Sequence, residues 1–138
     1  MKFDFVVLGA TGMQGRIVAK DLLQKGYTVL LCGRDKSRVE QFLKKYKKTA
    51  FAYIDIVKDP ISLQKIIERS SGNVVINCME GDWNANAANI CIAAGVHSID
   101  LGSDTPGTKK QFDLDKKLKK KNLKSKSVCR SIFNSEHP

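Results

Sequence analysis

Three glycines at three-residue intervals follow a short apolar run near the start of the chain. The run is residues 5–8, and the glycines are Gly9, Gly12 and Gly15. An amphipathic segment, residues 16–25, comes next. This order predicts a buried strand, a tight turn and a helix N-terminus. Turns are rich in glycine for many reasons, but a strand pattern before the glycines and a helix pattern after them favour a phosphate-binding turn.

The spacing of these glycines suits the approach of an anion to the backbone. Gly9 lets the chain turn out of the strand, Gly12 leaves room for a phosphate, and Gly15 lets the helix lie against the strand. Free N–H groups in the first helical turn and the positive end of the helix dipole would face the anion. We therefore predict that this turn binds the diphosphate of a dinucleotide. The predicted residues are Gly9, Ala10, Thr11, Gly12, Met13, Gln14 and Gly15.

Apolar runs and helical spacings alternate through the rest of the chain. Further strands are predicted for residues 27–32, 50–57, 73–78 and 96–101. The segments between them show the spacing of a helix with one apolar face, and Asp59-Pro60 is typical of a helix start. The alternation predicts an α/β fold, a doubly wound parallel sheet of the Rossmann type with three layers, α/β/α. The expected strand order is 3-2-1-4-5.

The length of 138 residues fits a single domain. We expect a dinucleotide-binding domain over residues 1–123. Residues 124–138 are weakly patterned, and we expect either a C-terminal tail or an edge strand there.

Arg34 stands at the end of the second expected strand, where NAD-binding proteins place Asp or Glu. A carboxylate there accepts from the ribose 2′-hydroxyl, whereas a guanidinium holds a 2′-phosphate through paired, charge-assisted hydrogen bonds. The sequence therefore predicts NADP(H) as the cofactor. NAD(H) is the runner-up, because Asp35 is adjacent. Two other interpretations stay open, namely Arg34 as a surface charge and Asp35 as the N-cap of the next helix.

Two later strand ends supply further candidate cofactor contacts. Asp55 and Ile56 end the third expected strand, beside the expected adenine pocket. The Asp55 carboxylate could accept from the adenine amine, or it could lie in solvent. Asn77 ends the fourth expected strand, which flanks the first at the switch point of the sheet, where ligands bind. Its amide could contact the ribose on the nicotinamide side or the nearby backbone.

The sequence leaves the catalytic residues unknown. None of the three tyrosines is followed by a lysine four residues later, which argues against a short-chain dehydrogenase active site. The four cysteines form no C-x-x-C pair and the two histidines are far apart, so we expect no metal site and buried, reduced thiols. We find no secretory signal and no apolar run that could span a bilayer. We therefore expect a cytoplasmic protein without membrane contact.

The net charge of +10 is concentrated late in the chain. Residues 109–126 hold nine lysines against two aspartates. Such a segment could bind nucleic acid, but no nucleic-acid-binding motif accompanies the lysines. We therefore predict the solvated face of a helix and do not expect nucleic acid as a partner.

Three stretches resemble the N-terminal NADP-binding domain of the saccharopine dehydrogenase family. They are residues 6–16, 93–102 and 110–115. The resemblance covers residues 3–123 and implies an NADP-dependent oxidoreductase that acts on a CH–NH bond of an amino acid adduct, in lysine or polyamine metabolism. In this resemblance the three glycines match the phosphate loop, and Arg34 matches the segment that meets the adenosine ribose.

The sequence departs from the family pattern after Leu123, where the family continues into a second domain with the substrate site and the dimer contacts. We therefore expect a stand-alone cofactor domain, a truncation or one part of a split protein, and we expect turnover to need a second domain. The expected partner is a catalytic domain or a second copy of the chain in a homodimer. The alternative is a non-enzymatic NADP(H)-binding or redox-sensing module of the NmrA-like sort, which uses the same Gly-x-x-Gly-x-x-Gly loop.

Overall fold

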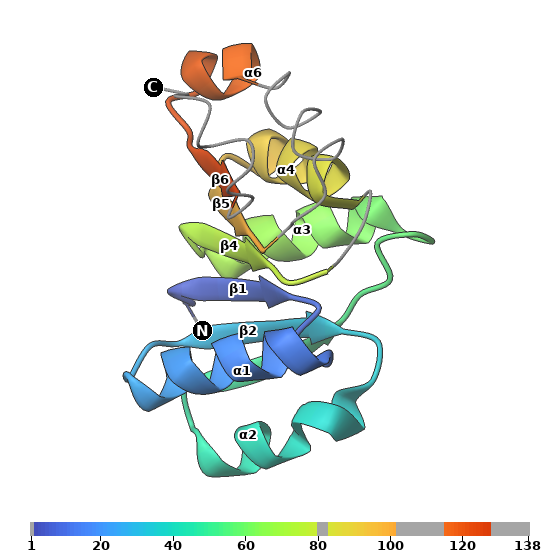
Figure 1. Cartoon of the computed structure of the whole chain (residues 1–138), viewed down its shortest axis with the longest axis vertical. Helices are drawn as coiled ribbons and strands as arrows, with labels where there is room; N and C mark the ends of the chain where they lie inside the picture. Colours follow the sequence, from blue (N-terminus) through green and yellow to red (C-terminus); the bar gives the residue numbers. More distant parts are fainter. Residues whose placement is uncertain (1, 80–82, 102–114, 128–138) are drawn as a thin grey trace.

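The computed structural model describes residues 2–79, 83–101 and 115–127, and strands and helices alternate along them (Figure 1). The strands are β1 (Phe5–Leu8), β2 (Val29–Gly33), β3 (Thr49–Tyr53), β4 (Val74–Asn77), β5 (His97–Asp100) and β6 (Ser125–Ser127). The helices are α1 (Met13–Gln24), the 3₁₀ helix η1 (Lys36–Val39), α2 (Glu40–Lys45), α3 (Pro60–Ser70), α4 (Trp83–Ala94) and α6 (Asp115–Lys120).

The strands form one sheet in the order β3-β2-β1-β4-β5-β6, with every neighbouring pair parallel. The predicted α/β class and the order of the first five strands are confirmed. Strand β1 is central, because Leu8 pairs with Cys32 of β2 on one side and with Asn77 of β4 on the other. Strand β6 adds an edge beside β5. The boundary of the domain at residue 123 stays a prediction.

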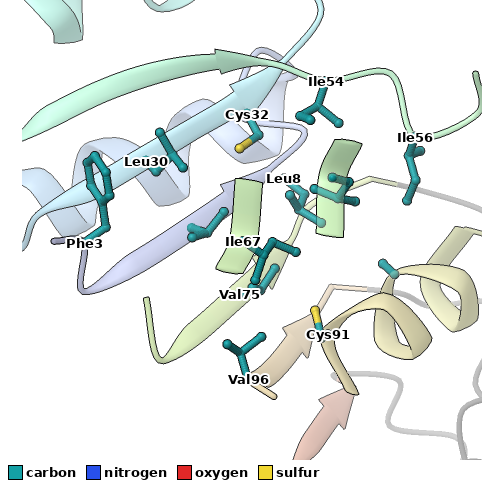
Figure 2. Packing of buried hydrophobic residues seen from close by; sticks show 13 residues of the cluster. Phe3, Leu8, Leu30, Cys32, Ile54, Ile56, Ile67, Val75, Cys91 and Val96 are labelled. Atoms are coloured by element: carbon teal, nitrogen blue, oxygen red, sulfur yellow. The ribbon is translucent and has the colours of Figure 1, made fainter. Parts of the chain in front are cut away.

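Alternate residues of the central strands point to opposite faces of the sheet, as the two-residue period of a strand requires. Val6 and Leu8 pack into a core with α3 and α4, whereas Val7 packs into a second core with α1 and η1. Figure 2 shows part of the first core, in which Ile67 and Cys91 come from the covering helices. Both faces of the sheet are thus covered, which explains why these strands are apolar throughout.

Strand β3 is shorter than predicted. It ends at Tyr53, so Asp55 and Ile56 lie in the loop after the strand, and the prediction that they end the strand is wrong. The chain turns there because the Asp55 Oδ1 accepts hydrogen bonds from the backbone N–H groups of Val57 and Lys58, at 3.1 and 3.2 Å. Ile56 is buried in the core, 6 % exposed.

Helix α6 presents lysines to solvent. Lys117, Lys119 and Lys120 are exposed, while Leu118 between them is buried. The lysines at 109 and 110 lie outside the described residues.

The start of α3 supplies a pH-dependent contribution to stability. Asp59 is its N-cap, and hydrogen bonds from the hydroxyl and then the backbone N–H of Ser62 lower the pKa of Asp59 below its ordinary value of 3.8. A lowered pKa means that this contribution is present above 3.8 and is lost as the pH falls through the folded-state value.

We predict that Asp59→Asn keeps the cap and shows a smaller loss of stability below about pH 4 than the unmodified chain. Asp59→Ala should be less stable at every pH, because the Ser62 N–H loses its acceptor. Thermal unfolding followed by circular dichroism across a pH series tests both. An identical acid dependence in Asp59→Asn and the unmodified chain would contradict the assignment.

Candidate functional site

The turn between β1 and α1 is closed so tightly that two of its positions admit only glycine. Gly9 has a φ of +72°, and a Cβ there would lie 2.9 Å from the Met79 Cγ. A Cβ on Gly15 would lie 2.0 Å from the Gly9 carbonyl oxygen. The first turn of α1 therefore rests directly on the backbone that leaves β1.

Gly12 differs from these two glycines. Its φ is −78°, which any residue adopts, and the nearest atom to an added Cβ is the Gly9 carbonyl oxygen at 3.4 Å. The fold itself therefore does not require glycine at this position. What its missing side chain leaves is open space beside the N-terminus of α1.

The N-terminus of α1 is suited to an anion. The first α-helical hydrogen bond runs from the Arg16 N–H to the Gly12 carbonyl at 3.0 Å, so the amides of Met13, Gln14 and Gly15 come before it. Gly12, the N-cap residue, offers no side-chain acceptor, and the first turn holds no acidic residue. Backbone N–H groups and the helix dipole together favour negative charge there.

A cavity of about 500 Å³ opens at the carboxyl ends of the strands. It is lined by Leu8, Gly9, Thr11, Gly12, Cys32, Gly33, Arg34, Arg38, Ile54, Asp55, Ile56, Val57, Cys78 and Met79. The cavity therefore joins the glycine turn, the end of β2, the loop after β3 and the end of β4. This is the edge at which a doubly wound sheet binds ligands.

Six of the predicted residues line this cavity: Gly9, Thr11, Gly12, Arg34, Asp55 and Ile56. The others have different positions. Ala10 is buried, and its N–H donates to the Cys32 carbonyl at 3.0 Å. Met13 and Gln14 are exposed on the first turn of α1, and Gly15 is buried beneath it.

Asn77 is buried and contacts the neighbouring backbone, one of its two predicted roles. Its Oδ1 accepts from the Met79 N–H at 3.0 Å. Met79 is the residue that lies against Gly9. Asn77 therefore fixes the chain that borders the glycine turn.

Two arginines line the basic side of the cavity, and the sequence predicted one of them, Arg34. Arg38 lines the cavity beside Arg34, and its Nη1 donates to the Thr11 carbonyl at 3.4 Å. The Thr11 side chain in turn lies over Gly33, where a Cβ would be 2.7 Å from the Thr11 Cγ2. The cluster of basic residues after Arg34 was the available signal for Arg38, but only the turn of η1 decides which of them reaches the cavity.

Asp35 caps the helix that follows it, which confirms this interpretation of the residue. Its Oδ1 accepts from the hydroxyl and, at 3.1 Å, from the N–H of Ser37. The hydroxyl bond is the main cause of the lowered pKa of Asp35. The carboxylate does not line the cavity.

Two thiols line the cavity, and both are protonated at neutral pH. Burial raises the pKa of Cys32 to about 12 and that of Cys78 to about 11. A protonated thiol is a poor nucleophile and a poor metal ligand. Within the described residues no group of three His, Cys, Asp or Glu side chains could hold a metal ion. Nor does any helix of the described part have the length and apolarity needed to cross a membrane.

A family comparison decides the relationship of the chain. The model of the saccharopine dehydrogenase NADP-binding domain matches residues 5–131. The chain belongs to this family. This is the family that the resemblance in the sequence implied.

Solved structures share the fold of this family member. Saccharopine dehydrogenase (L-Glu forming) from Saccharomyces cerevisiae superposes with a TM-score of 0.73 at 16% identity, over 91% of this chain and 26% of that one. Yeast methylglyoxal/isovaleraldehyde reductase, complexed with NADPH, gives a TM-score of 0.72 at 11% identity, over 89% of this chain and 52% of that one.

The WlbA dehydrogenase from Thermus thermophilus, in complex with NAD and α-ketoglutarate, gives 0.67 at 11% identity, over 90% of this chain and 40% of that one. This chain thus spans about a quarter to a half of the length of these three relatives. The shared fold occurs with both NADPH and NAD, so it does not by itself select the cofactor.

Two alanine substitutions separate packing from binding in the glycine turn. Gly15→Ala should destabilise the fold by about 1–3 kcal/mol or more, because its Cβ overlaps the Gly9 carbonyl. Gly12→Ala should leave the thermal unfolding midpoint nearly unchanged and weaken NADPH binding at least tenfold, about 1.4 kcal/mol. Calorimetric titration with NADPH and thermal unfolding of both variants measure these effects. If Gly12→Ala bound NADPH as the unmodified chain does, the diphosphate site would be elsewhere.

Proposed function

We propose that this chain is the NADP(H)-binding domain of an oxidoreductase that acts on a CH–NH bond of an amino acid adduct. In this proposal the substrate-binding groups come from a second domain or a second copy of the chain. The family match supports a dinucleotide cofactor. The observation that supports NADP(H) as the cofactor is one cavity with a glycine turn on one side and two guanidinium groups on the other.

The residues of the cavity fit NADP(H) part by part. The amides of the first turn of α1, with the open space at Gly12, would hold the diphosphate. Arg34 and Arg38 would hold the 2′-phosphate, and Asp55 and Ile56 would lie beside the adenine. The Asp55 carboxylate suits the adenine amine, because a carboxylate accepts hydrogen bonds from N–H donors.

The preference for NADP(H) over NAD(H) rests on the charges around the ribose side. NAD(H) is the runner-up because of Asp35. The Asp35 carboxylate, however, is hydrogen-bonded to Ser37 and is not part of the cavity lining. Among the described residues, the lining holds two arginines and a single carboxylate, Asp55. A 2′-phosphate would gain charge-assisted hydrogen bonds from this arrangement, whereas a 2′-hydroxyl would meet no described carboxylate on the part of the lining that follows β2.

In this proposal the described residues of the cavity bind and orient the cofactor. NADPH, when bound, supplies a hydride to the substrate. The cavity lining holds two protonated thiols, two arginines and one carboxylate that accepts from the backbone. No described residue of the lining is therefore assigned as a general acid or base in this proposal. We therefore assign proton transfer to the second domain, and we place the protein in the cytoplasm as part of the same proposal.

The same lack of an acid or base in the described lining favours one alternative, a non-enzymatic NADP(H)-binding or redox-sensing module of the NmrA-like sort. The two functions differ in turnover. Oxidation of NADPH by the chain combined with its second domain supports the oxidoreductase, whereas binding without turnover in every such combination supports the module.

Cofactor preference is tested at the two arginines. We predict that Arg34→Ala and Arg38→Ala each weaken NADPH binding by about tenfold to a hundredfold, the loss of one or two charge-assisted hydrogen bonds. NADH binding should change little, because NADH has no 2′-phosphate. Parallel calorimetric titrations with NADPH and NADH measure the two effects.

Lys36→Ala is the matched control, because Lys36 is exposed between the two arginines and does not line the cavity. It should keep the affinity for NADPH. An unmodified chain that bound NADH more tightly than NADPH, or an Arg34→Ala variant with unchanged preference, would refute the proposed cofactor.

A further inference from the structure

A second hollow, of about 420 Å³, lies between α1 and the η1–α2 segment, which run side by side in Figure 1. We call it the α1–α2 groove. Its lining residues are Met13, Arg16, Ile17, Lys20, Arg38, Val39, Gln41, Phe42, Lys45 and Tyr46. The proposed cofactor site uses the Arg38 side chain and the Met13 backbone amide among them, so the other side chains of the groove are not explained by the proposed function.

The apolar side chains of the groove are accessible. Met13 is 71% exposed and Ile17 is 66% exposed, and the two are neighbours one turn apart on α1. Phe42 and Tyr46, one turn apart on the other wall, are half-buried. Large apolar side chains gathered in a recess, rather than scattered singly, mark an interaction site.

The charged residues that line the groove in the described part of the chain are all basic. Arg16 and Lys20 line it from α1, and Arg38 and Lys45 line it from the other side. No carboxylate occurs among these described lining residues. Asp21, the acidic residue of α1, is paired with Lys25 at 2.8 Å.

We propose that the α1–α2 groove is the docking surface for an acidic amphipathic helix of a protein partner. The apolar face of such a helix would cover Met13 and Ile17, and its carboxylates would meet the basic residues of the groove. In helix-in-groove recognition the docking helix contributes apolar side chains at i, i+3, i+4 and i+7. Charge complementarity of this kind sets partner choice and speeds association.

Other occupants fit the groove less well. A second copy of the chain carries a net charge of +10, and a symmetric contact through the groove would bring the same four cations together. A single-stranded nucleic acid would stack its bases on a ring face, but the Lys45 amino group lies over the Tyr46 ring, 5.5 Å from its centre. A flat bilayer would reach the exposed Met13 and Ile17 but not the half-buried Phe42 and Tyr46.

The probe is a fluorescein-labelled synthetic helix of about four turns, with leucine on one face and glutamate elsewhere. A second peptide has the same composition in scrambled order, so that it has the charge without the apolar face. Fluorescence anisotropy with the full chain should give binding of the first peptide at least tenfold tighter than of the second. Equal binding of the two peptides, or no binding of the first, overturns the proposal.

Matched variants locate the site. Ile17→Gln and Lys20→Glu should each weaken binding of the amphipathic peptide about tenfold or more. Ile61→Gln and Lys65→Glu are the controls, because Ile61 is 68% exposed on α3 and Lys65 is exposed beside it. All four side chains are exposed, so thermal unfolding should stay unchanged.

Equal losses in the control variants would mean that bulk charge, not the groove, binds the peptide, and would overturn the proposal. A last experiment measures binding of the chain to phosphatidylserine vesicles. Vesicle binding that depends on Ile17, together with peptide binding that does not, would assign the groove to a membrane surface instead. Ile17 and Lys20 do not line the cavity of the proposed cofactor site, so failure here leaves the cofactor proposal intact.

Discussion

The structure depends on a contact between two glycines, where the first turn of α1 sits on the carbonyl of Gly9. The space for a Cβ on Gly15 is absent, since that atom would lie 2.0 Å from the carbonyl oxygen. This contact fixes the direction of α1 relative to the central strand of the sheet. The helix then covers one face of the sheet through Ala19 and Leu23, and its N-cap residue Gly12 lines the cavity at the strand ends. One steric constraint thus sets both a part of the core and one wall of the cavity.

The second wall of the site is held by contacts that meet at the same turn. Thr11 lies over Gly33 and accepts from Arg38 through its carbonyl, which ties the turn to the end of β2. Met79, positioned by Asn77, lies against Gly9 and ties the turn to the end of β4. The three central strands therefore reach the site through backbone and side-chain contacts, and a shift of any one of them would change the shape of the cavity.

The features that the sequence predicted correctly are those governed by local rules. The strand before the glycine turn, the N-cap at Asp59 and the strand order of an alternating α/β chain follow from nearest neighbours and from the handedness of crossovers. The end of β3 was predicted too late, because apolar Ile54 and Ile56 continue the strand pattern. In the fold, both residues instead enter the core from a loop whose turn is made by Asp55.

Side-chain direction was the part of the site that the sequence left undecided. Three basic residues, Arg34, Lys36 and Arg38, follow β2, and their spacing alone does not say which of them line the cavity. The turn of η1, capped by Asp35, directs Arg38 back toward Thr11 and leaves Lys36 out of the lining. Met13 likewise lies outside the cavity lining and lines the α1–α2 groove instead.

Arg38 lies in the wall between two hollows, the cavity at the strand ends and the α1–α2 groove. A side chain shared in this way cannot be fixed on one side without changing its freedom on the other. A molecule that held the guanidinium in the cavity would therefore change the affinity of the groove for its proposed partner. The reverse change would have the same magnitude, because the coupling free energy of two binding equilibria is reciprocal. In this arrangement one arginine would let the outer surface of the domain sense an occupied cavity.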